Sequence, residues 1–249
     1  MGAARRPERR RRAVRFIRKG AAPRCLGVAQ RTAKAEGGRP APDDWKLLPG
    51  DCAAKVRRAL WRDQSGLCAY CGVVIHRDGR DVPAASERAP AAGGMKIEHR
   101  LARSTHPEAT LSWSNLLGVC VGSTVPKAQR HCDAARGAEP LRLNPTRLPD
   151  LVDRFRYDAL GRMRPADPDD AAVAADIETL ALNAGRLMAN RATVIRALQA
   201  QLRQDDSVAS LRRLLSEATT PDEDGRLPTF APVAESYLRQ KLRSRGQAP

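Results

Sequence analysis

Three short motifs lie close together in the middle of the chain: MKIEH at residues 95–99, WSNLL at residues 113–117 and HCDAARG at residues 131–137. A fourth motif, CAYC, lies upstream at residues 68–71, and Cys120 falls between the second and third motifs. Together they bring carboxylates, imidazoles, an amide and four thiols into residues 68–137. This combination of side chains is typical of metal sites.

His99 and two nearby acids, Glu98 and Asp133, suit the hydrolysis of a phosphodiester bond. An imidazole titrates near neutral pH, so His99 is a candidate general base that takes a proton from water. Mg²⁺ and Mn²⁺ prefer oxygen ligands, and Mg²⁺ keeps several of its waters, so one or two carboxylates are enough to anchor the ion. We therefore predict Glu98 and Asp133 as ligands of a catalytic Mg²⁺ or Mn²⁺.

The MKIEH and WSNLL motifs also set geometric conditions. Successive residues of a strand point to opposite faces, so Glu98 and His99 can serve one site only if the strand bends or ends there. Asn115 follows His99 by sixteen residues. We expect its side chain to hold the intervening loop through hydrogen bonds to the backbone.

The cysteines predict a second, structural metal site. Cys68 and Cys71 form a C-x-x-C knuckle, and Cys120 and Cys132 are candidates for the other two ligands of a tetrahedral Zn²⁺. His131 is an alternative ligand in place of Cys132. Because Cys132 directly precedes Asp133, a closed zinc site would fix the start of the helix that carries this acid.

In this order, the motifs resemble the core of HNH endonucleases, in which a ββα unit holds one divalent metal and is braced by a structural zinc. Between residues 17 and 191 the chain is similar to the retron-associated HNH endonucleases and to the nuclease subunit of the Septu anti-phage system. Four further segments carry this narrower resemblance: RKGAAP (18–23), NP (144–145), FRYDALG (155–161) and LNAGRLMANR (182–191).

The resemblance implies an α+β fold with a ββα-metal, treble-clef-like core, a zinc site made of four cysteines and surrounding helices. It implies that Asn115 has a catalytic role by holding the histidine in place. It also implies a bacterial defence nuclease that acts beside an ABC-type or AAA-like ATPase, although the chain itself contains no P-loop motif. Three residues depart from the common HNH pattern: Glu98 stands where Asp is commoner, Asp133 where His or Asn is commoner, and Arg136 where Lys is usual.

The chain is strongly basic, with a formal net charge of +16. Such an excess favours a polyanionic partner, since lysine and arginine neutralise phosphates and release counterions, although a coding bias toward arginine is an alternative cause. Residues 1–24 carry ten basic residues and one acid, and their first dozen are expected to be a disordered arm. In the core we predict contacts to nucleic acid, to DNA more than RNA, at Arg100, Arg103, Lys127, Arg130 and Arg136.

No apolar run approaches the ~20 residues of a membrane span, and the N-terminus lacks the apolar segment of a secretory signal. We therefore predict a cytoplasmic protein with no membrane partner. In a reducing compartment, six cysteines of which four stand at metal-ligand spacing indicate zinc rather than disulfides. Cys25, which has no partner at ligand spacing, is predicted to be a small buried apolar residue, and Cys52 to be structural.

Outside the core the hydrophobic periodicity predicts mainly helices. They are expected at residues 51–63 with Asp51 as N-cap, from 169 to a break near 183, from there to about 202, at 208–218 and at 233–243. A short strand or extended segment is expected at residues 14–20, a strand at 73–75, and a hairpin that turns at 159–161. The predicted divisions are a basic arm with a short strand (1–24), an HNH nuclease core with structural zinc (25–165) and a helical C-terminal region (166–249).

These patterns together predict a metal-dependent endonuclease that hydrolyses DNA, or alternatively RNA. A function from another class is also open: a zinc-stabilised nucleic-acid-binding or adaptor module whose catalytic site is degenerate. The two hypotheses differ in one observable, which is cleavage of nucleic acid in the presence of Mg²⁺ or Mn²⁺.

Overall fold

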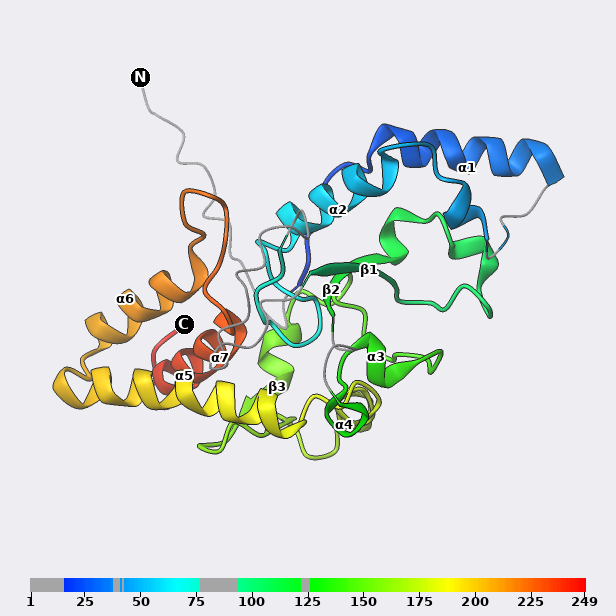
Figure 1. The fold of residues 1–249 in the computed structure, drawn as a ribbon. Helices are drawn as coiled ribbons and strands as arrows, with labels where there is room; N and C mark the ends of the chain where they lie inside the picture. The colour runs from blue at the N-terminus through cyan, green and yellow to red at the C-terminus, as the bar shows by residue number, and fades with distance from the viewer. Residues whose placement is uncertain (1–15, 38–40, 42, 77–93, 122–125) are drawn as a thin grey trace, which may run out of the picture.

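The computed structural model describes residues 16–37, 41, 43–76, 94–121 and 126–249. Within them a small antiparallel sheet, β1–β2, lies at the centre of the molecule (Figure 1). α1 and α2 lie on one side of this sheet, and α5, α6 and α7 gather on the other (Figure 1). The fold is α+β with small antiparallel sheets, as the sequence predicts.

The described residues form seven α-helices and four strands. The helices are α1 (Arg24–Gly37), α2 (Cys52–Asp63), α3 (Asp133–Arg136), α4 (Ala171–Thr179), α5 (Gly185–Gln204), α6 (Val208–Thr219) and α7 (Ala231–Arg243). The strands are β1 (Met95–His99), β2 (Leu116–Cys120), β3 (Phe155–Tyr157) and β4 (Met163–Pro165). Short 3-10 helices are η1 (Asp44–Leu47), η2 (Pro107–Ala109), η3 (Trp113–Asn115), η5 (Lys127–Gln129) and η6 (Leu151–Arg154).

The central sheet is held on both edges of β2. On one edge β1 pairs with it, from Met95 opposite Cys120 to His99 opposite Leu116. On the other edge the side chain of Gln64 takes the place of a strand, since it donates to Gly118 O and accepts from Gly118 N, both at 2.7 Å. A Cβ at Gly118 would meet the terminal methyl of Met95, so a larger residue there would make the flexible Met95 side chain move.

α2 covers the central sheet with the face that the sequence predicts. Val56, Leu60 and Trp61 are buried on it. Asp51 precedes the helix, but its side chain makes no capping hydrogen bond and instead pairs with Lys55 at 3.0 Å. Because both side chains are exposed, this pair contributes little to stability.

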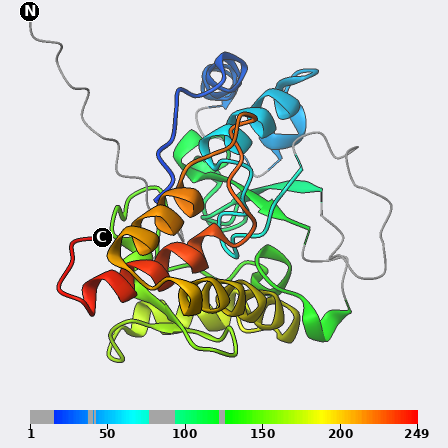
Figure 2. The same cartoon turned by 90° about the vertical axis from the view of Figure 1, so that its left-hand side faces the viewer.

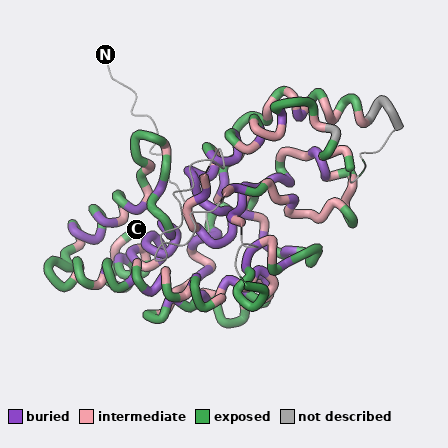
Figure 3. Tube along the Cα trace, viewed as in Figure 1, coloured by how far each residue is buried: buried purple, intermediate pink, exposed green. Residues whose placement is uncertain are grey.

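One large apolar cluster joins the regions on either side of residue 165. It extends from Ile17 to Val233 and includes the four thiols, β2, β3 and the buried side chains of α4. A smaller cluster lies between α5, α6 and α7. Figure 3 shows buried residues concentrated in the centre and exposed residues along the outer side of α5. The predicted nuclease core and helical region therefore share a single interior.

The C-terminal helices pack on the core, with α5, α6 and α7 stacked beside one another (Figure 2). Phe230 N, at the start of α7, donates to Gly72 O at 2.8 Å, directly after the CAYC motif. Ser236 Oγ of the same helix donates to Phe155 O at 3.1 Å. α7 thus links the cysteine knuckle to β3.

The β3–β4 hairpin forms as predicted and is fastened to α5. Gly161 in its turn has φ +75°, and a Cβ there would collide with the backbone of Met188. Arg191 of α5 donates to Gly161 O at 3.0 Å and also to Leu182 O. The hairpin therefore approaches α5 closely because Gly161 has no side chain, and Arg191 holds it there by hydrogen bonding.

Of the two alternatives for residues 14–20, the described part shows the extended segment, and the strand expected at 73–75 does not form. Residues 16–20 are extended without a strand partner, although Ile17 N donates to Pro145 O at 2.7 Å. Val74 makes an isolated antiparallel bridge with Leu67, and His76 makes an isolated parallel bridge with Gly94. The predicted basic arm lies largely outside the described residues, at positions 1–15.

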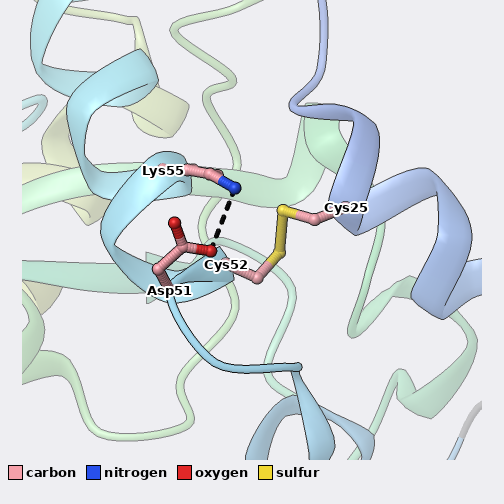
Figure 4. The surroundings of a disulfide bond; sticks show 4 residues. All are labelled: Cys25, Asp51, Cys52 and Lys55. Carbon is pink, nitrogen blue, oxygen red and sulfur yellow. Dashed lines mark ion pairs between the residues drawn. A yellow bond between two sulfur atoms is a disulfide. The ribbon is translucent and has the colours of Figure 1, made fainter.

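Cys25 and Cys52 form a disulfide bond between the first turns of α1 and α2 (Figure 4). The prediction of a small buried apolar residue at Cys25 was therefore wrong, as was the expectation of reduced thiols for this pair. A separation of 27 residues carries no pairing signal, whereas the packing of α1 beside α2 brings the two Cα atoms to 5.8 Å. None of the described helices combines the length and the apolar character that crossing a membrane requires.

Loss of the disulfide is expected to destabilise the protein without unfolding it. Replacement of both Cys25 and Cys52 by serine should lower the free energy of unfolding by about 3 kcal/mol, because the bond closes a loop of moderate length in the unfolded chain. Urea denaturation with and without a reductant measures this. Wild type should lose stability on reduction, and the double variant should not respond; equal stability of the two proteins under oxidising conditions would contradict the expectation.

The stability contributed by Lys19 is expected to depend on pH. Its Nζ donates to Leu116 O at 2.7 Å and lies 3.6 Å from the centre of the Trp113 ring, and burial lowers the pKa of Lys19 from 10.5 to about 7. Folding therefore favours the neutral amine, so the stabilisation is full above pH 10.5 and is lost as pH falls toward 7.

Denaturation at pH 7 and pH 10 tests this dependence. The stability of wild type relative to Lys19→Met should rise with pH over that interval by about 3.5 kcal/mol. Lys241, an exposed lysine near Tyr237, provides the matched control variant Lys241→Met. The same pH dependence in both variants would show that Lys19 is not its source.

Candidate functional site

The four cysteines of the predicted zinc site converge. Cys68, Cys71, Cys120 and Cys132 are all buried, and their sulfur atoms lie within 4.8 Å of one another. The Sγ atoms of Cys68 and Cys132 are 3.9 Å apart, those of Cys71 and Cys120 3.8 Å, and those of Cys120 and Cys132 3.7 Å. A tetrahedral ion with Zn–S bonds of about 2.3 Å separates its sulfur ligands by about 3.8 Å, so the cluster can bind a metal such as zinc.

Three separate parts of the chain deliver these thiols. Cys68 and Cys71 come from the turn after α2, Cys120 ends β2, and Cys132 precedes α3. Burial raises the pKa of the Cys132 thiol well above its ordinary value, while hydrogen bonding from Cys120 lowers the pKa of Cys71. Four thiolates cannot share such a buried space without a cation to neutralise them.

The backbone of Cys132 is strained in a way that serves the cluster. Its φ of +58° and ψ of −136° lie in a region that is almost restricted to glycine and costs on the order of 1–3 kcal/mol. Its N–H donates to Leu180 O at 2.8 Å, which holds this conformation from the end of α4. A ligand turned toward a metal gives such strain a physical reason.

His131 lies beside the cluster and is not one of the four converging donors. Its Nδ1 is 3.3 Å from Cys132 Sγ and 3.8 Å from Cys120 Sγ. All four ligand positions are accounted for by cysteine, so the alternative with His131 in place of Cys132 is not the arrangement observed.

The two predicted catalytic acids lie near each other and each is paired with a cation. Glu98 forms an ion pair with the guanidinium of Arg136, and Asp133 Oδ2 accepts from Lys96 Nζ at 2.6 Å. Burial raises the pKa of Glu98 to about 7; the charge of Arg136 opposes this shift, and the charge of Asp133 adds to it. The second oxygen of Asp133, Oδ1, is buried and has no hydrogen-bond partner among the described residues.

His99 is the last residue of β1, and its side chain has different neighbours from that of Glu98. Its Nε2 lies 3.0 Å from Thr110 O, and its ring meets Trp45 edge-on at 5.0 Å between centres. The side chain is almost buried, with 9% of the residue exposed, and burial lowers the pKa of His99 to about 4. Glu98 and His99 thus face opposite sides of β1, which ends at His99. The following loop begins directly after this residue.

Asn115 makes the hydrogen bonds that its position suggests. Its Oδ1 accepts from Leu101 N at 2.7 Å, and its Nδ2 donates to Leu101 O and to Ala109 O, both at 3.1 Å. These bonds close the loop that leaves His99 and returns to β2. The same loop carries Thr110, whose carbonyl contacts the His99 ring. The catalytic role of Asn115 stays a prediction.

The five predicted nucleic-acid contacts are not equivalent. Arg136 needs correction: its side chain is 1% exposed and donates to Glu98 and to Glu139 O at 2.7 Å, so it is an internal brace. Arg100 is half-buried, and its Nη1 lies 3.3 Å from Leu141 O. Lys127 and Arg130 are exposed. Arg103 is partly exposed, and its charge contributes to the low pKa of His99.

Three residues of the site were not foreseen from the sequence: Trp45, Thr110 and Lys96. Trp45 comes from η1, more than fifty positions before His99, and no periodicity links the two. Thr110 contributes a backbone carbonyl, which any residue type offers. Lys96 did carry a signal, since residues i and i+2 of a strand share a face and Lys96 is two residues before Glu98.

In comparisons with known proteins, no family model matches the chain, and no curated protein matches it. Any function proposed for it therefore depends on its own residues and geometry.

One zinc ion per chain is expected by elemental analysis. The change Cys68→Ser should abolish zinc binding and unfold the core, because structural zinc sites contribute about 10–16 kcal/mol in small zinc-binding peptides. Circular dichroism with metal analysis measures both effects. Cys25→Ser, which removes a cysteine outside the cluster, is the matched control and should retain zinc. A folded Cys68→Ser protein of wild-type stability would contradict a structural role for the metal.

Proposed function

We propose that this protein is a metal-dependent endonuclease of the HNH type, which hydrolyses phosphodiester bonds of DNA or, alternatively, RNA. The observation that carries the proposal is the order of elements around the cysteine cluster. β1 ends in Glu98 and His99, β2 returns antiparallel to it through Asn115, and α3 begins with Asp133 directly after a cysteine of the cluster. This order supports the ββα arrangement that we propose for the site.

The acids on this face suit a hard cation such as Mg²⁺ or Mn²⁺. Asp133 Oδ1 is a buried oxygen without a partner among the described residues, and Glu98 lies close enough for the two charges to interact. Carboxylate oxygens are the ligands that these ions prefer, and one or two of them suffice. When bound, the ion supplies positive charge to the scissile phosphate and to the leaving oxygen.

His99 has the properties of a general base. Its low pKa keeps the ring neutral at pH 7. With Nε2–H donated to Thr110 O, the lone pair lies on Nδ1, which can take a proton from water. The water oxygen then bonds to phosphorus, the bond from phosphorus to the leaving oxygen breaks, and that oxygen takes a proton from solvent. Asn115 and Trp45 keep the ring in place during this step.

The resemblance to retron-associated and Septu nucleases supports a setting for this activity. We place the chain in anti-phage defence, beside an ATPase encoded nearby that restrains or triggers the cut. Co-purification with the product of the neighbouring gene tests this setting separately from the chemistry.

A second candidate function is a zinc-stabilised nucleic-acid-binding or adaptor module. The observation in its favour is that Glu98 is already paired with a buried arginine and that His99 is largely covered. A protein that shifts DNA in a gel but never cuts it with Mg²⁺ or Mn²⁺, alone or with its neighbour, would be this module.

Replacement of the proposed base tests the nuclease. His99→Ala should lower the rate of plasmid cleavage with Mg²⁺ or Mn²⁺ by about 100-fold or more, because general base catalysis contributes roughly 10²- to 10⁴-fold. Zinc content and thermal stability serve as checks on the fold. His106→Ala is the matched control, since His106 is partly exposed and pairs with Glu108 at 3.2 Å. Undiminished cleavage by His99→Ala would rule out this base.

A further inference from the structure

Lys96 lies on the same face of β1 as Glu98, two residues earlier in the strand. Its Nζ is 2.6 Å from Asp133 Oδ2, so it touches one of the two proposed metal ligands directly. The face therefore holds two acids, Glu98 and Asp133, and two cations, Lys96 and Arg136. The function proposed above uses the acids and assigns no task to the lysine.

The two cations differ in their freedom to move. The side chain of Arg136 is 1% exposed, and its guanidinium also donates to Glu139 O at 2.7 Å, so it is fixed in the interior. The side chain of Lys96 is 45% exposed, whereas that of Asp133 is 10% exposed. Lysine is a compact charge on a flexible stem. The ammonium of Lys96 can therefore swing away from Asp133 into solvent without crossing the protein interior.

Asp133 has an oxygen available for a second cation. Oδ2 carries Lys96, while Oδ1 is buried and lacks a partner among the described residues. A buried oxygen without a hydrogen-bond partner is unfavourable, and coordination of a cation would remove that cost. An ion bound there would repel the nearby ammonium, since like charges at short range destabilise each other. The Lys96 side chain would then move toward the solvent-exposed side of β1.

We infer that Lys96 is a phosphate-contacting catalytic residue, which exchanges its pairing with Asp133 for a backbone phosphate of the nucleic acid when a divalent cation binds. The inference rests on the proposed function, because the phosphate belongs to its substrate. While paired with Asp133, Lys96 neutralises this acid beside Glu98 and so limits the repulsion between the two acids. In the loaded protein, its charge stabilises the phosphate, whose negative charge grows during attack by water.

Binding of Mn²⁺ without nucleic acid tests the first half of the inference. Lys96→Gln should bind Mn²⁺ more tightly than wild type, by roughly 5-fold, because a competing positive charge is removed. Isothermal titration calorimetry on the zinc-loaded protein measures the dissociation constants. Lys55→Gln is the matched control: Lys55 also pairs with an aspartate, Asp51, at 3.0 Å, and lies outside the proposed site. This control should bind Mn²⁺ as wild type does.

Plasmid cleavage at saturating Mn²⁺ tests the second half. Lys96→Gln should lower kcat about 100-fold, the effect of losing one charge-stabilising contact in the transition state. Lys96→Arg, which keeps the charge, should restore most of this loss. A lysine that merely held Asp133 in position would give the opposite sign in calorimetry, since its removal would weaken Mn²⁺ binding.

The outcomes separate this inference from the function on which it rests. Weaker or unchanged Mn²⁺ binding by Lys96→Gln would overturn the inference that Lys96 leaves Asp133 when the cation binds. Equal cleavage by wild type and Lys96→Gln overturns the phosphate contact alone and leaves the nuclease standing. A wild-type protein that binds no Mn²⁺ and cuts nothing overturns the proposed function and the inference together.

Discussion

The convergence of four thiols is the constraint on which the rest of this structure depends. It brings together a turn after α2, the end of β2 and the start of α3, three pieces that share no continuous secondary structure. α3 is a helix of four residues and too short to hold itself in place. Its position therefore depends on Cys132 at its start and on the pairs that Asp133 and Arg136 make with Lys96 and Glu98 of β1.

The two faces of β1 carry different chemical groups. One face carries carboxylates with their cations, and the other carries the imidazole with Trp45 and the Thr110 carbonyl. The end of the strand at His99 is where the two faces meet, and Asn115 holds the chain that leaves from it. Glu98 therefore lies among ion pairs, whereas its neighbour His99 is a neutral ring that is largely covered.

The sequence predicted those parts of the fold that depend on local pattern. The C-x-x-C spacing, the apolar face of α2, the hairpin at Gly161 and the break before α5 all follow from short-range rules and appear in the structure. Contacts between distant segments were missed or misjudged: the Cys25–Cys52 bond, the approach of Trp45 to His99 and the burial of Arg136. Each arises from packing of the whole molecule, which a single sequence records only indirectly.

The hydrogen bond from Cys132 N to Leu180 O joins a thiol of the cluster to the end of α4. Together with the shared interior, it makes the carboxyl-terminal helices part of the scaffold rather than an accessory module. If the chain were divided between the core and the carboxyl-terminal helices, as by recombination between related genes, both fragments would expose apolar surfaces. A regulator that separated the two parts would have to disrupt this shared apolar cluster.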